Sequence, residues 1–286
     1  MSNKYDLRRL QLLQLDILKE VKRVCDEHNL TFYIMNGTCL GAIRHKGAIP
    51  WDDDIDIGMY VADFDKFVTL QKELDNKYFI QTIDTDPEFC TMIARVRMQG
   101  TTIIEKDFED CDINHGVFID IYPLFSYPTN PISERILSWK SLVYRLLLAG
   151  RPPKNHGILA KKIGNIILRV YSGTKRDKYI RGFHQKLRNG DTRSRYVAFL
   201  YGMDVHLFRT IKYERTWFGK PTMVQYENTT MPAPTDWDSY LKIRYNDYMK
   251  LPPVDKRSSY HSFEFVDLDN SYERYKGIKY LKNSAT

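Results

Sequence analysis

The sequence predicts an α+β fold: a mixed β-sheet flanked by helices, with a basic helical insert. Three observations predict it. The chain opens on an amphipathic helical pattern, continues through several short strand-like runs, and turns helical and basic over residues 131–190. It has 286 residues, 43% hydrophobic and 28% charged, so it can bury a sizeable core and has the composition of a globular protein.

The first elements follow from periodicity. Apolar residues recur at spacings of three and four and predict a helix ending near residue 28: Leu10, Leu13, Ile17, Val21 and Val24. The run TFYIM predicts a strand stopped by Gly37, CLGAIRH a short helix, and the alternating DIDIGMY a second strand. We expect Asp63 to cap the next helix, whose inward residues are Phe64, Phe67 and Leu74.

Later elements complete the expected sheet. Further strand patterns are YFIQTI, TMIARVRM, TTIIE, GVFIDIYPL and KPTMVQYE. The stretch TDWDSYLKIRYNDYM predicts an amphipathic helix capped by Asp236 or Thr235. We therefore expect a core in residues 1–130, a basic helical insert in residues 131–190, and a C-terminal part, residues 191–286, that completes the core.

The charge of this chain is unevenly distributed. Residues 131–190 hold 14 Lys or Arg against Glu134 and Asp177, a balance of +12, so a total of +7 leaves −5 elsewhere. We expect two amphipathic helices there, broken at Pro152-Pro153. A solvated helical surface is the simplest interpretation. A positive surface would also attract an anionic membrane or a polyanion. Nothing resembles a nucleic-acid recognition motif.

Targeting features are sparse. MSNKYDLRRL has no apolar run after its charges, and the most apolar stretch, SLVYRLLLAG, is too short to span a bilayer. Four scattered cysteines do not form a disulfide framework. We expect reduced thiols in a cytoplasmic protein that associates with the inner face of the membrane through its basic segment.

An acidic stretch, WDDDIDIGM, carries the strongest functional signal. Strand alternation places Asp54 and Asp56 on one face with Asp52, whereas Asp53 points away. Two carboxylates roughly 6–7 Å apart repel at neutral pH unless a cation lies between them. Oxygen ligands favour a hard divalent ion, and Mg²⁺ commonly bridges to substrate phosphates. The alternative is an acidic strand edge that discourages aggregation.

The neighbouring residues favour phosphate chemistry. Gly37-Thr38 offers a turn with free backbone N–H groups ahead of a helix, and Arg44, His45 and Lys46 supply cationic donors. Asp120 lies on an apolar strand, where an unpaired carboxylate is costly. Gly-Thr, Asp-x-Asp and a later strand aspartate together form the catalytic pattern of the nucleotidyltransferase fold, whose third aspartate orients or deprotonates a hydroxyl.

These motifs resemble a known family. GTCLGAIRHKGAIPWDDDIDIGM looks like the signature of the LicD family, which includes bacterial phosphocholine transferases and is related to fukutin-type enzymes. TTIIE, HGVFIDIYPL and YLKIRYNDYMKLPP are similar to its later blocks, so the resemblance covers residues 7–124 and 219–253. Asn246 departs from the pattern, because the family usually has glycine there.

The resemblance implies a nucleotidyltransferase-like catalytic core and a reaction. The family transfers phosphocholine from CDP-choline, or a similar CDP-linked donor, to a sugar hydroxyl and releases CMP, with Mg²⁺. The acceptor is a cell-surface glycan such as a teichoic acid, lipopolysaccharide or capsule precursor, often lipid-linked. Carried onto this sequence, Asp54 and Asp56 become metal ligands and Asp120 a third ligand or base. Gly37 and Thr38 would contact the diphosphate.

Five further residues are candidates. His115 is the second choice for the base, and Arg44 and Arg97 could stabilise the leaving CMP, although Arg97 is equally well read as a solvated strand charge. Lys46 lies in the same cationic loop as Arg44. A quaternary ammonium needs aromatic walls, for which Trp51 is the first choice and Tyr122 the second; a structural tryptophan is the simpler alternative.

Two other functions fit the same residues. A transferase of ribitol phosphate, or of a nucleotide from a nucleoside triphosphate, would have an identical metal site. A non-enzymatic module that binds cations or polyanions would use the acidic loop without turnover, and would give Asp120 no role.

Overall fold

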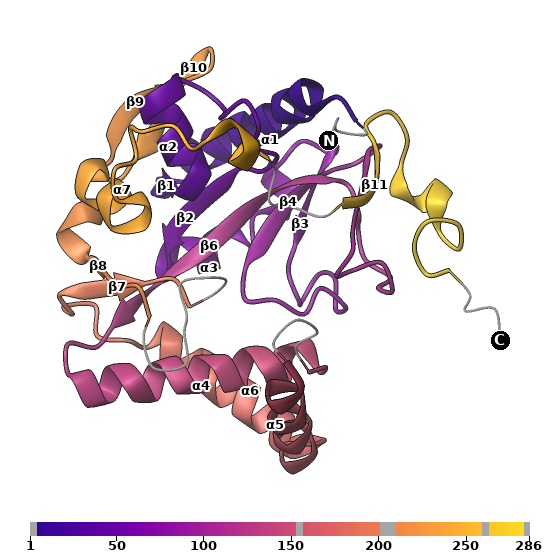
Figure 1. The fold of residues 1–286 in the computed structure, drawn as a ribbon, viewed down its shortest axis with the longest axis vertical. Helices are drawn as coiled ribbons and strands as arrows, with labels where there is room; N and C mark the ends of the chain where they lie inside the picture. Colours follow the sequence, from indigo (N-terminus) through magenta and orange to yellow (C-terminus); the bar gives the residue numbers. More distant parts are fainter. Residues whose placement is uncertain (1–4, 153–156, 201–209, 259–262, 283–286) are drawn as a thin grey trace.

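The structure is a computed structural model that describes residues 5–152, 157–200, 210–258 and 263–282. It confirms a mixed α+β fold, organised on a sheet with strand order β1-β2-β6-β4-β3, to which β7 and then β8 add beside β6 (Figure 1). The strands are β1 (Phe32–Ile34), β2 (Asp56–Tyr60), β3 (Tyr78–Gln81), β4 (Ala94–Met98), β6 (Val117–Tyr127), β7 (Tyr196–Ala198) and β8 (Tyr213–Glu214).

Strand β6 is the centre of the sheet. It runs parallel to β2 on one side and antiparallel to β4 on the other, and its last three residues pair with β7. The apolar residues Ile119 and Ile121 alternate with Asp120 and Tyr122, so the two sets lie on opposite faces of the sheet. The prediction of a strand from GVFIDIYPL is confirmed, and it places Asp120 in the middle of the molecule.

Two helices pack on the central strands. Helix α1 (Leu7–Glu27) contacts β6 and β4, and α3 (Val61–Phe67) contacts β2 and β6. The apolar stripe predicted for α1 is confirmed, because Ile17, Val21 and Val24 are fully buried. The cap predicted for α3 is wrong: the helix begins at Val61, so Asp63 lies in its first turn.

Helix α2 (Asn36–His45) is longer than the sequence indicated. The predicted turn at Gly37-Thr38 is part of its first helical turn, where backbone N–H groups have no acceptor within the helix. Beside α2 lies the hairpin of β9 (Thr222–Tyr226) and β10 (Thr229–Ala233). Helix α2 precedes the acidic loop in sequence, and Glu227 in the hairpin turn holds the connection between them. Its N–H donates to the Lys46 carbonyl over 2.8 Å, and its carboxylate accepts from the Ala48 N–H over 3.0 Å.

Helix α7 (Trp237–Tyr245) confirms the predicted C-terminal helix and packs on α2. Asp236 is its N-cap and accepts a hydrogen bond of 3.0 Å from the Ser239 N–H. The helix ends at Asn246 with φ 55° and ψ −111°, a conformation that glycine adopts most easily. This geometry gives a physical reason for glycine at this position in the family that the sequence resembles.

The strand predicted from TTIIE does not join the main sheet. It forms β5 (Thr102–Glu105), which pairs with β11 (Phe263–Asp267) in a separate two-stranded sheet. Short 3-10 helices complete the described structure: η1 (Gln71–Glu73), η3 (Arg215–Phe218), η4 (Val254–Lys256) and η5 (Tyr272–Tyr275).

Residues 131–190 form three helices rather than the two we expected, and these lie together at one end of the molecule (Figure 1). They are α4 (Pro131–Ala149), α5 (Gly157–Val170) and α6 (Thr174–Arg188). Residues of α4 and α6, such as Tyr144 and Phe183, share an apolar cluster with Phe125 at the end of β6. Among the described helices, none combines the length and apolar character needed to cross a bilayer.

Candidate active site

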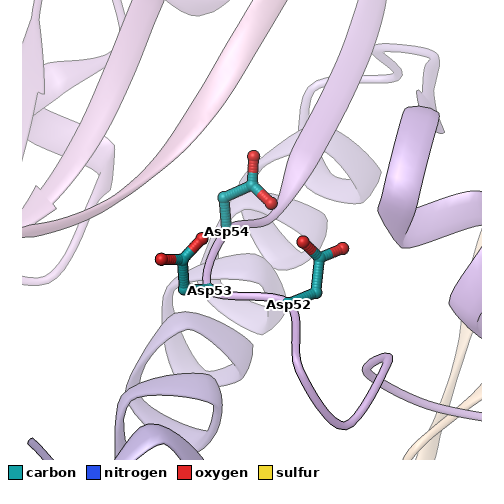
Figure 2. A group of neighbouring side chains, drawn as sticks. All are labelled: Asp52, Asp53 and Asp54. Carbon is teal, nitrogen blue, oxygen red and sulfur yellow. The ribbon is translucent and has the colours of Figure 1, made fainter. Parts of the chain in front are cut away.

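Three acidic side chains gather on the chain just before β2. Carboxylate oxygens of Asp52, Asp53 and Asp54 lie within 4.8 Å of one another, and Figure 2 shows them grouped around one bend. The strand predicted from Asp54 begins only at Asp56, so alternation does not govern these three residues. The prediction that Asp53 points away from the other two is therefore wrong. Asp53 is fully buried, and the Tyr5 hydroxyl donates to its Oδ2 over 3.3 Å.

Helix α1 holds the backbone of this acidic loop. The Gln11 side-chain amide donates to the carbonyls of Ile49 (3.0 Å) and Asp52 (2.8 Å). Gln14 donates to the carbonyls of Asp53 (2.9 Å) and Phe118 (3.2 Å), which ties the loop to β6. Both glutamines are buried, where such bonds are costly to lose. The acidic loop is thus fixed by α1 before any ligand binds.

Asp56 and Asp120 lie side by side in the sheet. They are direct partners in the parallel pairing of β2 with β6, so their side chains leave the same face of neighbouring strands. Strand spacing puts their Cα atoms about 5 Å apart. Both residues are buried, so their charges repel strongly unless cationic or hydrogen-bonding groups compensate.

Asp56 is held by the start of α2. The Asn36 side-chain amide donates to Asp56 Oδ2 over 3.0 Å, and the Asp56 N–H donates to the Thr38 hydroxyl oxygen over 2.8 Å. Asn36 is fixed in turn by Tyr240 of α7, whose hydroxyl donates to Asn36 Oδ1 and accepts from the Asn36 N–H. The aspartate on β2 therefore depends on a helix nearly two hundred residues later.

Asp120 is held by Arg95 of β4. The Arg95 Nε donates to Asp120 Oδ1 over 2.6 Å, and its two terminal nitrogens bind both carboxylate oxygens of Glu105. The guanidinium carbon lies 3.8 Å from the Phe118 ring centroid. Burial alone would lower the pKa of Arg95, but the charges of Asp120 and Glu105 outweigh it and raise that pKa. Arg95 is consequently a permanent cation between two carboxylates.

Helix α7 forms another wall of the site. Burial raises the pKa of the Tyr245 hydroxyl, while the neighbouring Arg244 lowers it and the charges of Asp56 and Asp52 raise it further. The direct contact of α7 with the site is made by Tyr240, whose hydroxyl is hydrogen-bonded to Asn36. The block YLKIRYNDYM, which resembles a family motif, is thus brought to the aspartates by the packing of α7 on α2.

Gly37 is needed for the close approach of Asp52. A Cβ atom at position 37 would overlap the Asp52 carboxylate, so any larger residue must displace that carboxylate. We expect Gly37→Ala to lower any cation-dependent activity of this site about ten- to a hundredfold, because it displaces a carboxylate that is a candidate cation ligand. Urea unfolding should show little change in stability. The matched control is Gly182→Ala in α6, where nothing lies within 4 Å of the new Cβ. Equal activity of the two variants would show that the Asp52 position does not matter.

His115 is not in the site. It precedes β6 and lies roughly 15 Å from Asp120 along the extended chain. Its ring is fully buried, 4.5 Å from the Tyr280 ring centroid, and its Nε2 lies 3.2 Å from the Cys111 carbonyl oxygen. The structure therefore does not bring this second candidate base to the aspartates.

Burial lowers the pKa of His115 to about 4, with a smaller effect from Arg97. The unfolded chain binds this proton near pH 6.5, so folding stability should fall as the pH drops from 6.5 toward 4. We expect His115 to contribute about 2 kcal/mol of this loss by pH 4.5. Urea unfolding from pH 7 to 4.5 should therefore show a shallower decline for His115→Gln than for the wild type. Parallel declines would contradict the buried neutral imidazole.

The two predicted arginines have structural partners. Arg97 is fully buried rather than solvated; its Nε donates to Gln81 over 2.7 Å and its Nη1 to the Gly116 carbonyl over 2.7 Å. Burial and the adjacent charge of Arg95 lower its pKa. Arg44 is half-buried at the end of α2 and donates to the Tyr248 carbonyl over 2.7 Å. The arginine that touches Asp120 is Arg95, which the sequence did not single out.

Trp51 and Lys46 lie at the edge of the site. The Arg257 guanidinium lies 5.3 Å from the Trp51 ring centroid, and the His45 ring meets that of Trp51 edge-on at 5.9 Å. Because the Arg257 guanidinium already lies against the Trp51 ring, this ring is less suited to binding the quaternary ammonium of a ligand. Lys46 is exposed, in the left-handed conformation that ends α2.

Sequence reasoning missed the residues that hold the aspartates. Gln11 and Gln14 are polar residues three positions apart on the buried side of the amphipathic helix α1. Such buried polar residues indicate hydrogen bonds to another part of the chain, so they could have been identified from the sequence. Asn36 directly precedes Gly37 and could have been included with it. Arg95 and Glu105 gave no signal beyond being charged residues in apolar strands, which need a buried partner.

The side chains fit a hard divalent cation. All of the candidate donors, Asp52, Asp54, Asp56 and Asp120, offer carboxylate oxygens, which Mg²⁺ prefers, and no sulfur or imidazole ligand lies among them. The loop and strands that carry them are fixed by hydrogen bonds within the protein. These carboxylates are therefore candidate ligands for a divalent cation, although only Asp52, Asp53 and Asp54 have carboxylate oxygens within 4.8 Å of one another.

Comparisons with known proteins match this chain to one family and to one named relative. Residues 29–141 match the family described as LicD/FKTN/FKRP, nucleotidyltransferase domain. A lipopolysaccharide cholinephosphotransferase LicD of Haemophilus influenzae is 28% identical over 269 residues, which is 90% of this chain and 97% of that protein. Uncharacterized proteins of Rickettsia prowazekii and Rickettsia typhi are each 46% identical over 50 residues, 18% of this chain and 18% and 16% of theirs.

Proposed function

This chain carries the nucleotidyltransferase domain of the LicD/FKTN/FKRP family and is a distant homologue of a LicD cholinephosphotransferase, and on that premise we propose that it transfers phosphocholine. The donor is CDP-choline or a similar CDP-linked compound. The acceptor is a sugar hydroxyl of a cell-surface glycan, such as a lipopolysaccharide, teichoic acid or capsule precursor. CMP is released, and the reaction needs Mg²⁺.

The pairing of Asp56 with Asp120 carries the proposal. Two buried carboxylates in register on neighbouring strands repel each other, and this repulsion lowers the stability of the fold. We therefore infer that the pair has a functional role. The acidic loop lies just before Asp56, and this whole group falls within residues 29–141. A cation-dependent phosphoryl transfer gives all of these carboxylates a purpose.

Each residue has a distinct task in this reaction. Asp54 and Asp56 would hold Mg²⁺ with Asp120, and the ion would neutralise charge on the donor phosphates. The first-turn N–H groups of Gly37 and Thr38 are suited to a phosphate oxygen. If Asp120 acts as the base rather than as a third metal ligand, its Oδ2 would take the acceptor proton, because its Oδ1 is bound to Arg95. The acceptor oxygen bonds to the phosphorus of phosphocholine, the bond from that phosphorus to CMP breaks, and the hydroxyl proton passes to Asp120 or solvent.

Aromatic residues beside the aspartates suit the choline group. Tyr122 is half-buried, its hydroxyl lies 3.5 Å from Asp120 Oδ2, and its ring meets that of Phe199 at 5.9 Å. Aromatic faces and surrounding carboxylates both attract a quaternary ammonium, so we place the choline near Tyr122 rather than Trp51.

The test is release of CMP by the purified protein. The protein is incubated with Mg²⁺, a lipopolysaccharide or teichoic acid preparation as acceptor and, separately, CDP-choline, CDP-ribitol, CDP-glycerol or CTP, with and without a chelator. We expect chelator-sensitive CMP release from CDP-choline. Preference for CDP-ribitol would instead support transfer of another phospho-group, and pyrophosphate from CTP would support nucleotidyl transfer. Cation binding without turnover of any donor would support a binding module.

A further inference from the structure

Helix α5 exposes an apolar stripe that nothing in the described structure covers. Five of its large apolar side chains are between 45% and 77% exposed: Ile158, Leu159, Ile163, Ile166 and Val170. Four of them, starting at Leu159, are spaced by four, three and four residues, so they form one line along the helix. A continuous exposed apolar line on a surface helix indicates an interaction site.

The rest of α5 divides into two further sides. Gly164 is buried and Ile167 half-buried, on the side that meets α4. The cations Lys161, Lys162 and Arg169 are exposed on the remaining side, and the helix has no acidic residue. The apolar stripe is therefore bordered by positive charge, on a segment whose overall balance is +12. This arrangement is typical of helices that lie in the surface of a membrane.

The neighbouring helix repeats the pattern. On α4, Ile132, Ile136 and Trp139 are 69%, 49% and 44% exposed and are spaced by four and three residues. Tryptophan is enriched at membrane–water boundaries, where its ring meets both headgroups and acyl chains. Figure 1 shows that α4 and α5 lie at the end of the molecule away from most of the sheet, so this end is accessible to a broad surface.

We propose that α5 lies in the surface of an anionic membrane, with its apolar stripe among the acyl chains and its lysines and arginine at the headgroups. With 14 residues, about 21 Å, α5 is too short to span a bilayer and would lie along it. The charge and the apolar character of α5 together favour an anionic membrane over a second copy of the chain and over a polyanionic glycan. A second copy of the chain would place two basic surfaces against each other, and a polyanionic glycan has no apolar surface for the stripe.

The test is flotation of the full chain with lipid vesicles. One set is phosphatidylcholine alone, and the other contains about 30% phosphatidylglycerol. We expect binding to the anionic vesicles at about 50 mM salt, at least tenfold weaker binding at about 500 mM, and little binding to the neutral set. Absence of binding to anionic vesicles at low salt would overturn the proposal.

Variants separate insertion from simple attraction. The stripe variant Leu159→Ser/Ile163→Ser/Ile166→Ser should lose at least tenfold in binding to anionic vesicles, since exposed side chains can be changed without loss of the core. The charge variant Lys161→Gln/Lys162→Gln/Arg169→Gln should reduce binding at low salt. The control Val254→Ser/Ile278→Ser changes residues 76% and 62% exposed outside this segment and should bind as the wild type does.

Two results would contradict the proposal. Unchanged vesicle binding by the stripe variant would mean that charge alone attracts the protein, with no insertion. A change of oligomeric state in the stripe variant, measured by light scattering, together with no vesicle binding by the wild type, would identify α5 as an interface between copies. Far-ultraviolet circular dichroism of each variant checks that the total helix content matches that of the wild type.

Discussion

Asp56→Asn and Asp120→Asn are each expected to lower CMP release from CDP-choline by about a thousandfold or more. The substitution keeps the shape of the side chain but removes one of the charges that would hold Mg²⁺, and the lost stabilisation of phosphate charge is worth several kcal/mol. The measurement is the initial rate of CMP release at saturating Mg²⁺, with Mg²⁺ affinity measured in parallel by calorimetry.

Asp56→Asn is the cleaner of the two variants. Asp120 also pairs with Arg95, so its replacement is expected to cost stability as well as activity. Asp56 instead accepts from the neutral Asn36 amide, and an asparagine at position 56 can keep this hydrogen bond through its own Oδ1. The matched control is Asp110→Asn, an exposed aspartate in the turn after β5. Full turnover in Asp56→Asn would remove the basis of the proposed reaction.

Arg95→Met is expected to destabilise the fold by about 3–5 kcal/mol. Arg95 is 5% exposed and lies between Asp120 and Glu105, so its loss leaves two buried carboxylates without their cation. Methionine fills a similar volume, which limits the contribution of a cavity. The free energy of unfolding in urea measures the effect.

The control for this prediction is an exposed ion pair of the same residue types. Arg195 binds Glu214 with two nitrogens, but it is largely exposed, so Arg195→Met should cost about 1 kcal/mol or less. Similar losses in Arg95→Met and Arg195→Met would show that burial does not strengthen the dependence of Asp120 on Arg95. A large loss of unfolding free energy in Arg95→Met alone would show that the fold depends on the buried cation at this position of β4.

The sequence and the structure agree best where a local pattern is strong. The stripe of α1, the strand through Asp120 and the capped helix α7 were all predicted correctly, because periodicity and capping act over a few neighbouring residues. The cap of α3 was wrong because Asp63 accepts instead from the Thr31 N–H, a contact with a distant segment. The local preference of an aspartate for the N-cap position is thus overridden by a tertiary hydrogen bond.

The candidate site shows the same division. Asp56 and Asp120 could be selected as candidates from sequence because carboxylates on apolar strands need a partner. Asp54 was selected as part of the same strand, but it lies in the loop before β2. Arg97 was chosen in place of Arg95, although the two are equivalent in the local pattern of β4, two positions apart on one face. Only the antiparallel pairing of β4 with β6 puts Arg95, and not Arg97, opposite Asp120.

By itself the sequence determined which carboxylates are costly to bury, which segments are helical or extended, and which segment is basic, since these depend on neighbours along the chain. The tertiary structure alone decided that Asp56 and Asp120 are partners, that α7 supplies Tyr240 to hold Asn36, and that His115 is sealed away from them. The physical reason is register: hydrogen bonding between strands and packing between helices set which distant residues meet, and no pattern within one segment encodes that choice.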